Sequence, residues 1–169
     1  MNWTRLLEGE IEGTYRATDG LMQLTEGLPL DWRPATGSNW MTTGQLLHHL
    51  TNACGHCCRG FVTGDWGMPA NATDADMTPP AEKMPSVKSV ADARKLLADD
   101  KAVALRMVKE VGEKDLDVKL VGAPWNPTQH AMGRQFLFMT QHLASHKSQL
   151  FYYLKLQGKP VHTGSLWGM

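Results

Sequence analysis

The sequence predicts an all-α protein, a four-helix bundle with long connecting loops. In four stretches of about 20 to 30 residues apolar side chains recur every three or four positions, whereas the alternation typical of strands is scarce. The chain has no internal repeat, and its 169 residues suffice for one ordinary core. We therefore expect residues 1–169 to fold as a single domain in which four helices pack together.

The first helix is predicted over residues 3–28, and Pro29 is expected to end it. The second helix is predicted from about Thr42 to Phe61, with Thr42 or Thr43 as a suitable N-cap. The apolar face of the first helix comprises Leu7, Ile11, Thr14, Thr18, Leu21 and Leu28. In the second helix, the apolar period places His49 at the edge of the core and its neighbour His48 in solvent.

Residues 63–88 are rich in Gly, Pro, Asp, Asn and Thr and show no regular period, so we expect a long functional or mobile loop. A third helix is predicted over residues 89–112, with Ser89 as its cap. Its buried face comprises Val90, Leu97, Ala104, Val108 and Val111. Residues 113–127 are expected to be irregular, with a short extended piece between Val118 and Val121.

The fourth helix is predicted to begin near Thr128, and Gly158 and Pro160 are expected to stop it. Its apolar seam comprises Phe136, Met139, Leu143, Leu150 and Tyr153. His146 takes the place of the leucine expected in the middle of this seam, and His142 lies one turn earlier. Residues four apart lie on the same face of a helix, so two imidazoles are side by side at the edge of the core.

Three histidines are therefore candidate metal ligands, namely His49, His142 and His146. His49 is the natural third ligand because metal sites in bundles form between facing helices. Three neutral imidazoles suit zinc, nickel, iron or copper and leave a coordination position open, which is typical of catalytic sites. The alternative is that these histidines are structural and are satisfied by hydrogen bonds.

Two stretches resemble motifs of the DinB family. Residues 39–53 read NWMTTGQLLHHLTNA and are similar to the first motif, a Trp-led turn entering a helix that ends in a His-Leu pair. Residues 142–158 read HLASHKSQLFYYLKLQG and are similar to the second motif, HxxxHxxQ followed by aromatic residues and a glycine. The resemblance covers nearly the whole chain and implies a DinB-like four-helix bundle that holds one divalent ion.

Carried over to this sequence, the family's ligands are His49, His142 and His146. His49 is the histidine followed by leucine, as in the family motif. Lys147 and Ser148 stand where the family often has Arg-Gly, a departure that leaves the ligands intact. Gln149 matches the family glutamine, and we expect it to support the site by hydrogen bonding.

The resemblance implies a metal-dependent enzyme whose ion, zinc or nickel first and iron or manganese next, activates a thiol or water. Related bundles include thiol-dependent S-transferases and a thiol-dependent maleylpyruvate isomerase, and many members have no assigned activity. The first expectation is an S-transferase acting on a small molecule with a low-molecular-weight thiol. A non-catalytic metal-binding bundle of stress-response type and a metal-dependent hydrolase are the alternatives. Pairing of family members through helix faces implies a homodimer.

Other reactive side chains are expected to have lesser roles. Cys54 and Cys57 form a CxxC, but they lie inside a predicted helix, whereas redox chemistry needs the first cysteine at a helix start, so we expect buried thiols. His56 lies two turns beyond His49, roughly 10 Å along an ideal helix, and is expected to line a pocket or to be hydrogen-bonded. Surface roles are expected for His130, His162, Asp99 and Asp100, and pocket-wall roles for Trp66 and Trp125.

Charge and hydropathy exclude several classes of protein. Lys plus Arg and Asp plus Glu number 17 each, so the formal net charge is zero and no basic patch points to nucleic acid. The charged start MNWTRLLEGEIEG is not a signal peptide, and no apolar run approaches the eighteen or so residues of a membrane span. Three cysteines make a poor disulfide framework. We expect a soluble cytoplasmic protein.

Overall fold

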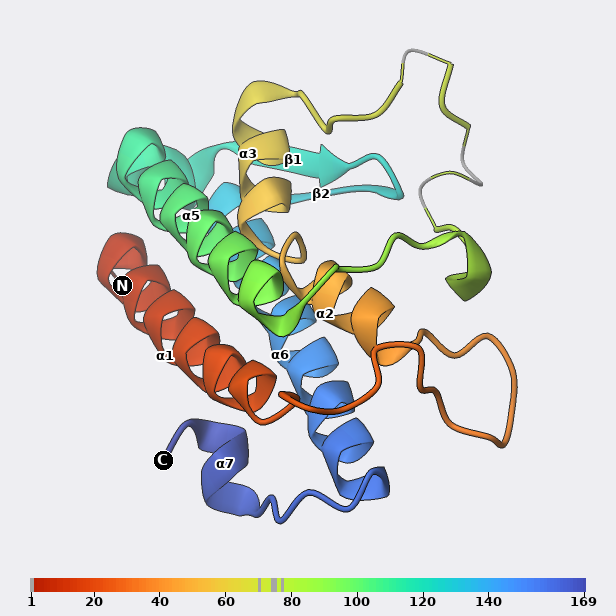
Figure 1. Cartoon of the computed structure of the whole chain (residues 1–169). Coiled ribbons are helices and arrows are strands. Elements are labelled where there is room, and N and C mark those ends of the chain that lie inside the picture. The colour runs from red at the N-terminus through yellow and green to blue at the C-terminus, as the bar shows by residue number, and fades with distance from the viewer. Residues whose placement is uncertain (1, 70, 74–75, 77) are drawn as a thin grey trace.

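The computed structural model describes residues 2–69, 71–73, 76 and 78–169. The described chain is mostly helical (Figure 1), as predicted. Its helices are α1 (Trp3–Gln23), α2 (Thr43–Leu50), α3 (Gly55–Thr63), the short 3-10 helix η1 (Ala81–Lys83), α5 (Val90–Val118), α6 (Met132–Leu156) and α7 (Thr163–Trp167). Within these residues, none of the helices is both long enough and apolar enough to cross a membrane.

The long helices pack around one hydrophobic core. Figure 1 shows α1 beside α5, and both helices pack against α6. Helix α2 packs on α6, and α3 lies between α5 and α6. The face of α6 that enters the core is the predicted one, because Phe136, Met139, Leu143, Leu150 and Tyr153 are all buried. Helix α7 folds back onto α1 and α6, so that the C-terminal segment covers one end of the core.

The predicted second helix is two helices in the structure. Helix α2 begins after an N-cap at Thr42, one of the two expected positions, which forms a capping box with Gln45, but the helix ends at Leu50. Helix α3 begins at Gly55, after a non-helical Cys54 with φ −129° and ψ −64°. A Cβ on Gly55 would lie 2.0 Å from the backbone oxygen of Asp100, so only glycine permits this approach of α3 to α5. The break gives α3 its own direction relative to α2.

Three other boundaries differ from the prediction. Helix α1 ends at Gln23 rather than at residue 28, because residues 24–28 form hydrogen-bonded turns with Gly27 at φ +78°. Helix α5 kinks at Gly112, where φ is 73° and ψ is 164°, and then continues to Val118. The predicted end at residue 112 is therefore the position of a kink.

Helix α6 begins at Met132 rather than near residue 128, because the preceding residues belong to a β-hairpin. Strand β1 (Leu120–Ala123) pairs antiparallel with β2 (Asn126–Ala131), with Leu120 opposite Ala131 and Ala123 opposite Asn126. The short extended piece expected near residues 118–121 is thus one strand of a pair. The hairpin turn places Trp125 at its tip.

Candidate metal centre

The structure brings the three predicted histidines together. His49 lies in the last turn of α2, and His142 and His146 lie one turn apart on α6. The Nε2 atom of His142 is 3.3 Å from Nε2 of His49 and 3.1 Å from Nε2 of His146. His48, which was expected in solvent, is half-buried and borders a separate surface pocket with Ser86. The choice of His49 over His48 from the apolar period therefore agrees with the geometry.

The two nitrogen separations centred on His142 fit a single divalent ion. Zinc–nitrogen bonds of about 2.0–2.1 Å in a tetrahedron place neighbouring nitrogens about 3.3 Å apart. The two distances centred on His142 match this value. Unprotonated imidazole nitrogens repel one another at such distances, because each presents a lone pair, and a cation among them removes the repulsion. Two unprotonated Nε2 atoms this close, in His142 and His146, suit a cation between them better than a hydrogen bond.

Partners of the Nδ1 atoms set the tautomers of two of the rings. His142 donates its Nδ1 hydrogen to the backbone oxygen of Ala53 over 3.1 Å. His146 donates its Nδ1 hydrogen to Oε1 of Gln149 over 3.0 Å, which agrees with the supporting role predicted for that glutamine. With the proton on Nδ1, each Nε2 presents its lone pair to the cluster.

Burial favours the uncharged form of two of these histidines, His49 and His146. Loss of hydration, followed by repulsion from His146 and His142, lowers the pKa of His49 from 6.5 to about 3. Burial also lowers the pKa of His146, against the opposing effect of its hydrogen bond to Gln149. Neutral imidazoles are the form that binds metal, so protons compete weakly for His49 and His146 at pH 7.

A cavity of about 470 Å³ opens over the three histidines. Its other lining residues come from the α2–α3 region, the loop after α3 and the hairpin tip, and they are Met41, Asn52, His56, Cys57, Thr78, Pro79, Met84 and Trp125. The prediction that His56 lines a pocket is confirmed. The chain breaks between α2 and α3, so the two residues do not lie on one continuous helix, and His56 is not among the clustered histidines.

The cysteines behave as buried thiols. Cys54, Cys57 and Cys58 are all buried and free. Cys57 borders the cavity, and loss of hydration on burial raises its pKa from 9.0 to about 12, so it is a protonated thiol at neutral pH. Cys54 precedes the start of α3 rather than lying within a helix, but its sulfur faces the hydroxyl of Thr140 at 3.8 Å. The exclusion of a redox role from the sequence rested on a continuous helix that the structure does not have.

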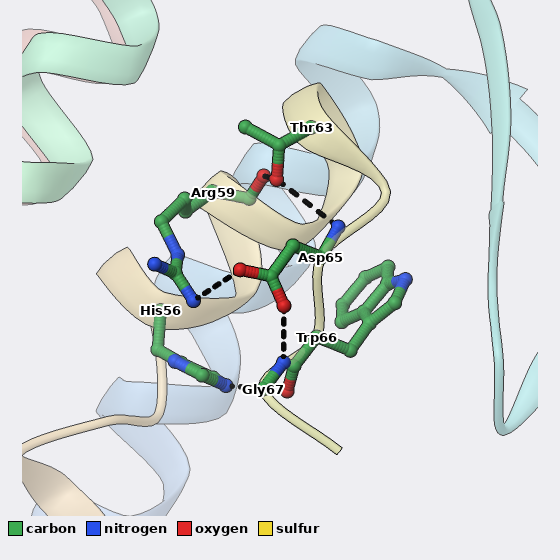
Figure 2. Close-up of polar contacts among 6 residues, drawn as sticks. All are labelled: His56, Arg59, Thr63, Asp65, Trp66 and Gly67. Carbon is green, nitrogen blue, oxygen red and sulfur yellow. Dashed lines mark hydrogen bonds and ion pairs between the residues drawn. The ribbon is translucent and has the colours of Figure 1, made fainter. Parts of the chain in front are cut away.

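A turn after α3 positions an aromatic side chain behind the cavity wall. Figure 2 shows Asp65 between Arg59 and the backbone of Gly67, with the His56 ring directed at the backbone of this turn. Trp66 packs edge-to-face on Trp125, with ring centroids 5.2 Å apart. The predicted role in the pocket wall is confirmed for Trp125, which lines the cavity. Trp66 is not among the lining residues and instead packs against the Trp125 ring.

Sequence reasoning missed Asp100. It was expected in solvent, but its side chain is buried and accepts hydrogen bonds from the hydroxyl of Tyr15 at 2.6 Å and from the backbone nitrogens of Gly55 and His56 at 2.9 and 2.7 Å. The missed signal is the helical period, because residue 100 lies between Leu97 and Ala104 on the buried face. Asp99 is exposed, as expected.

The two remaining histidines lie apart from the cavity lining. His130 is in β2, and its ring packs on Phe138 with centroids 5.5 Å apart. His162 is exposed and caps α7, because its Nδ1 accepts the backbone hydrogen of Gly164 over 3.1 Å. Neither residue contributes to the metal centre.

Comparison with known proteins identifies the family. The family model described as the DinB superfamily matches residues 11–150, which include all three clustered histidines. No curated protein and no solved structure matches the chain. The match spans α1 to most of α6, and hence most of the chain. The chain belongs to the DinB superfamily.

Proposed function

We propose that the chain is a metal-dependent S-transferase in which His49, His142 and His146 hold one divalent ion. The observation that carries the proposal is the convergence of three Nε2 atoms at the edge of an open cavity. Zinc or nickel is the first candidate for the ion, and iron or manganese is the next. In this proposal α1, α2 with α3, α5 and α6 are the four elements of the bundle, within a single domain.

The protein residues prepare the ligand set before an ion arrives. Ala53 and Gln149 hold the protons of His142 and His146 on Nδ1, and burial keeps His49 neutral. Three ligands leave room for a fourth on the cavity side. A bound divalent ion with such an open position lowers the pKa of a thiol or water and holds it as a nucleophile.

The composition of the cavity favours a thiol over water. Met41, Met84 and Trp125 give it apolar walls, which suit a thiol and a carbon electrophile. In the transfer, the S–H bond of the thiol and the bond from the electrophilic carbon to its leaving group break, and a C–S bond forms. The leaving group departs with the electron pair of its bond, and the proton leaves with it or to solvent. Hydrolysis would need a cavity that retains water next to the three histidines, so it is the second candidate reaction.

Metal content tests the ligand set. Protein purified without a nickel column is expected to contain about one divalent ion per chain, and the His146→Ala and His49→Ala variants are expected to lose it. His48→Ala is the matched control, because it removes the adjacent histidine that borders a different pocket. Equal metal content in His49→Ala and in the unaltered protein would refute the ligand set, provided that circular dichroism shows unchanged helix content.

Cobalt substitution tests the choice of a thiol. Addition of cysteine or glutathione to cobalt-loaded protein is expected to produce the sulfur-to-cobalt charge-transfer absorption of a bound thiolate. A cobalt spectrum that no thiol alters, together with a large fall in melting temperature on chelation, would support the non-catalytic alternative. In that case the ion would only tie α2 to α6, the two helices that carry the histidines.

A further inference from the structure

The cavity above the three histidines is lined, in the described part of the chain, by apolar and polar side chains without acidic or strongly basic groups. Among the described residues that line it, none is Lys, Arg, Asp or Glu. Apart from the histidines, the polar side chains are those of Asn52, His56, Cys57 and Thr78. A cavity of about 470 Å³ matches a small organic molecule. An anion that entered it would lose hydration without gaining a cationic side chain, so the lining favours an uncharged ligand.

Trp125 gives the cavity a fixed aromatic wall. Its ring stands edge-to-face on Trp66 at 5.2 Å, and Trp66 stands in the same way on Phe61 at 4.9 Å. Gly60 admits the Trp66 ring, since a Cβ there would lie 2.4 Å from it. Phe61, Trp66 and Trp125 thus form a row of edge-to-face contacts from the core to the hairpin tip. This row holds Trp125 in place although 44% of it is exposed.

The turn that holds Trp66 is organised by Asp65 (Figure 2). The carboxylate pairs with Arg59 at 3.2 Å and accepts the backbone hydrogen of Gly67 at 2.9 Å. The backbone nitrogen of Asp65 donates to the hydroxyl of Thr63 at 3.1 Å. These contacts fold the chain back along α3, and they direct the backbone oxygen of Trp66 toward His56.

Two polar side chains in the cavity have hydrogen-bonding capacity that the described part of the chain does not use. His56 donates its Nε2 hydrogen to the oxygen of Trp66 at 3.1 Å, because a carbonyl can only accept. Nδ1 of the neutral ring is then an acceptor. The side-chain amide of Asn52 makes no hydrogen bond within the described part of the chain, so it can donate to a ligand carbonyl.

We infer that the cavity binds an uncharged aromatic carbonyl compound, with its ring on Trp125 and its polar group between Asn52 and His56. Asn52 donates to the carbonyl oxygen, and Nδ1 of His56 accepts an adjacent N–H or O–H. The role of this compound as the electrophile of the transfer rests on the proposed function, whereas its binding rests only on the cavity walls.

Two compounds of the same shape test the inference. In 2-naphthamide and 2-naphthoate the ring is identical and only the charge of the substituent differs. Calorimetric titration of metal-free protein is expected to give at least about tenfold tighter binding of the amide, because no cationic side chain compensates the carboxylate. The metal-free form is used for this comparison because a carboxylate could bind the ion directly.

Variants locate the binding site in the zinc-loaded protein. Trp125→Ala is expected to weaken 2-naphthamide binding about tenfold or more, and Asn52→Leu is expected to weaken it in the same direction. Trp167→Ala is the matched control, because Trp167 is an exposed tryptophan in α7 outside the cavity lining.

The outcomes separate this inference from the proposed metal centre. Equal affinity for the two compounds, or equal affinity of Trp125→Ala and Trp167→Ala for 2-naphthamide, would overturn the ligand class and leave the metal assignment intact. Absence of zinc binding with the tenfold preference retained would refute the metal centre and support the ligand class.

Discussion

The imidazole of His146 donates its Nδ1 hydrogen to the side-chain oxygen of Gln149 across 3.0 Å. The oxygen faces His146 because the amide nitrogen of Gln149 is directed at the hydroxyl of Tyr153, 3.4 Å away. Tyr153 in turn donates to the backbone oxygen of Met41 over 2.8 Å. This chain of contacts fixes one tautomer of His146, and its Nε2 lone pair is thereby directed at the other two histidines.

We expect Gln149→Leu to lower zinc affinity about 10- to 100-fold, because His146 loses the acceptor that orients its ring. Competition with a chromogenic zinc chelator at pH 7 measures the change. Gln141→Leu is the matched control, since Gln141 is an exposed glutamine of the same helix with no contact to the cluster. Equal zinc affinity in the two variants would show that Gln149 does not position the ligand.

The histidine cluster could be predicted from the sequence because its determinants are local. The apolar period of α6 identifies His142 and His146 as one face, and the same period selects His49 in α2. The family motif adds Gln149. Each of these inferences needs only a helix and its facing partner, and both are specified by patterns within about ten residues.

The composition of the cavity could not be predicted in the same way, because it depends on contacts between distant segments. His56 reaches the cavity only because the chain breaks at residues 51–54, and that break is held by Asp100 from α5. Trp125 reaches it through a hairpin of which the sequence indicated only the first strand, as a short extended piece. The second strand is exposed over its first four residues and lacks the apolar alternation that marks a strand in a sequence. The break and the pairing of the two strands have no local signature.

Asp100 is expected to be required for the start of α3. Its carboxylate accepts three hydrogen bonds, from the hydroxyl of Tyr15 and the backbone nitrogens of Gly55 and His56. Asp100→Asn keeps the shape but leaves one acceptor oxygen, so we expect the free energy of unfolding to fall by about 1–3 kcal/mol. Urea denaturation at pH 7 measures it.

The exposed neighbour supplies the control for that substitution. Asp99→Asn is expected to change the free energy of unfolding by less than about 0.5 kcal/mol. Burial raises the pKa of Asp100, so part of the hydrogen-bond energy offsets the cost of desolvating its charge. If Asp100→Asn were as stable as Asp99→Asn, the desolvation cost would equal the whole gain from the three hydrogen bonds.

The metal-free protein is expected to lose stability as the pH falls below about 6.5. Burial lowers the pKa of His49 from 6.5 to about 3, and it also lowers the pKa of His146. As the pH falls through about 6.5, these histidines become protonated in the unfolded chain but stay neutral in the folded chain. Their contribution to the free energy of unfolding is therefore constant above this pH and decreases as the pH falls toward 3.

Urea denaturation of chelated protein at pH 7.5 and pH 5 measures this effect, in a range above the usual titration of carboxyl groups. His49→Asn is expected to show a smaller fall between the two pH values than the unaltered protein. His162→Asn, which changes an exposed histidine, is expected to retain the full fall. A fall of the same size in His49→Asn would place the effect in other groups.

Substitutions at two helical glycines test whether the Trp66 ring is held against α3. Alanine normally stabilises a helix relative to glycine by about 0.5–1 kcal/mol, and Gly13→Ala in α1 should show this gain because no atom lies within 4 Å of the new Cβ. At Gly60 the new Cβ would lie 2.4 Å from the Trp66 ring, so we expect a net loss of about 1–3 kcal/mol. Displacement of Trp66 should also shift its fluorescence and weaken 2-naphthamide binding, since Trp125 rests on it. Equal stabilisation by the two substitutions would mean that the row of edge-to-face contacts of Phe61, Trp66 and Trp125 does not form in solution.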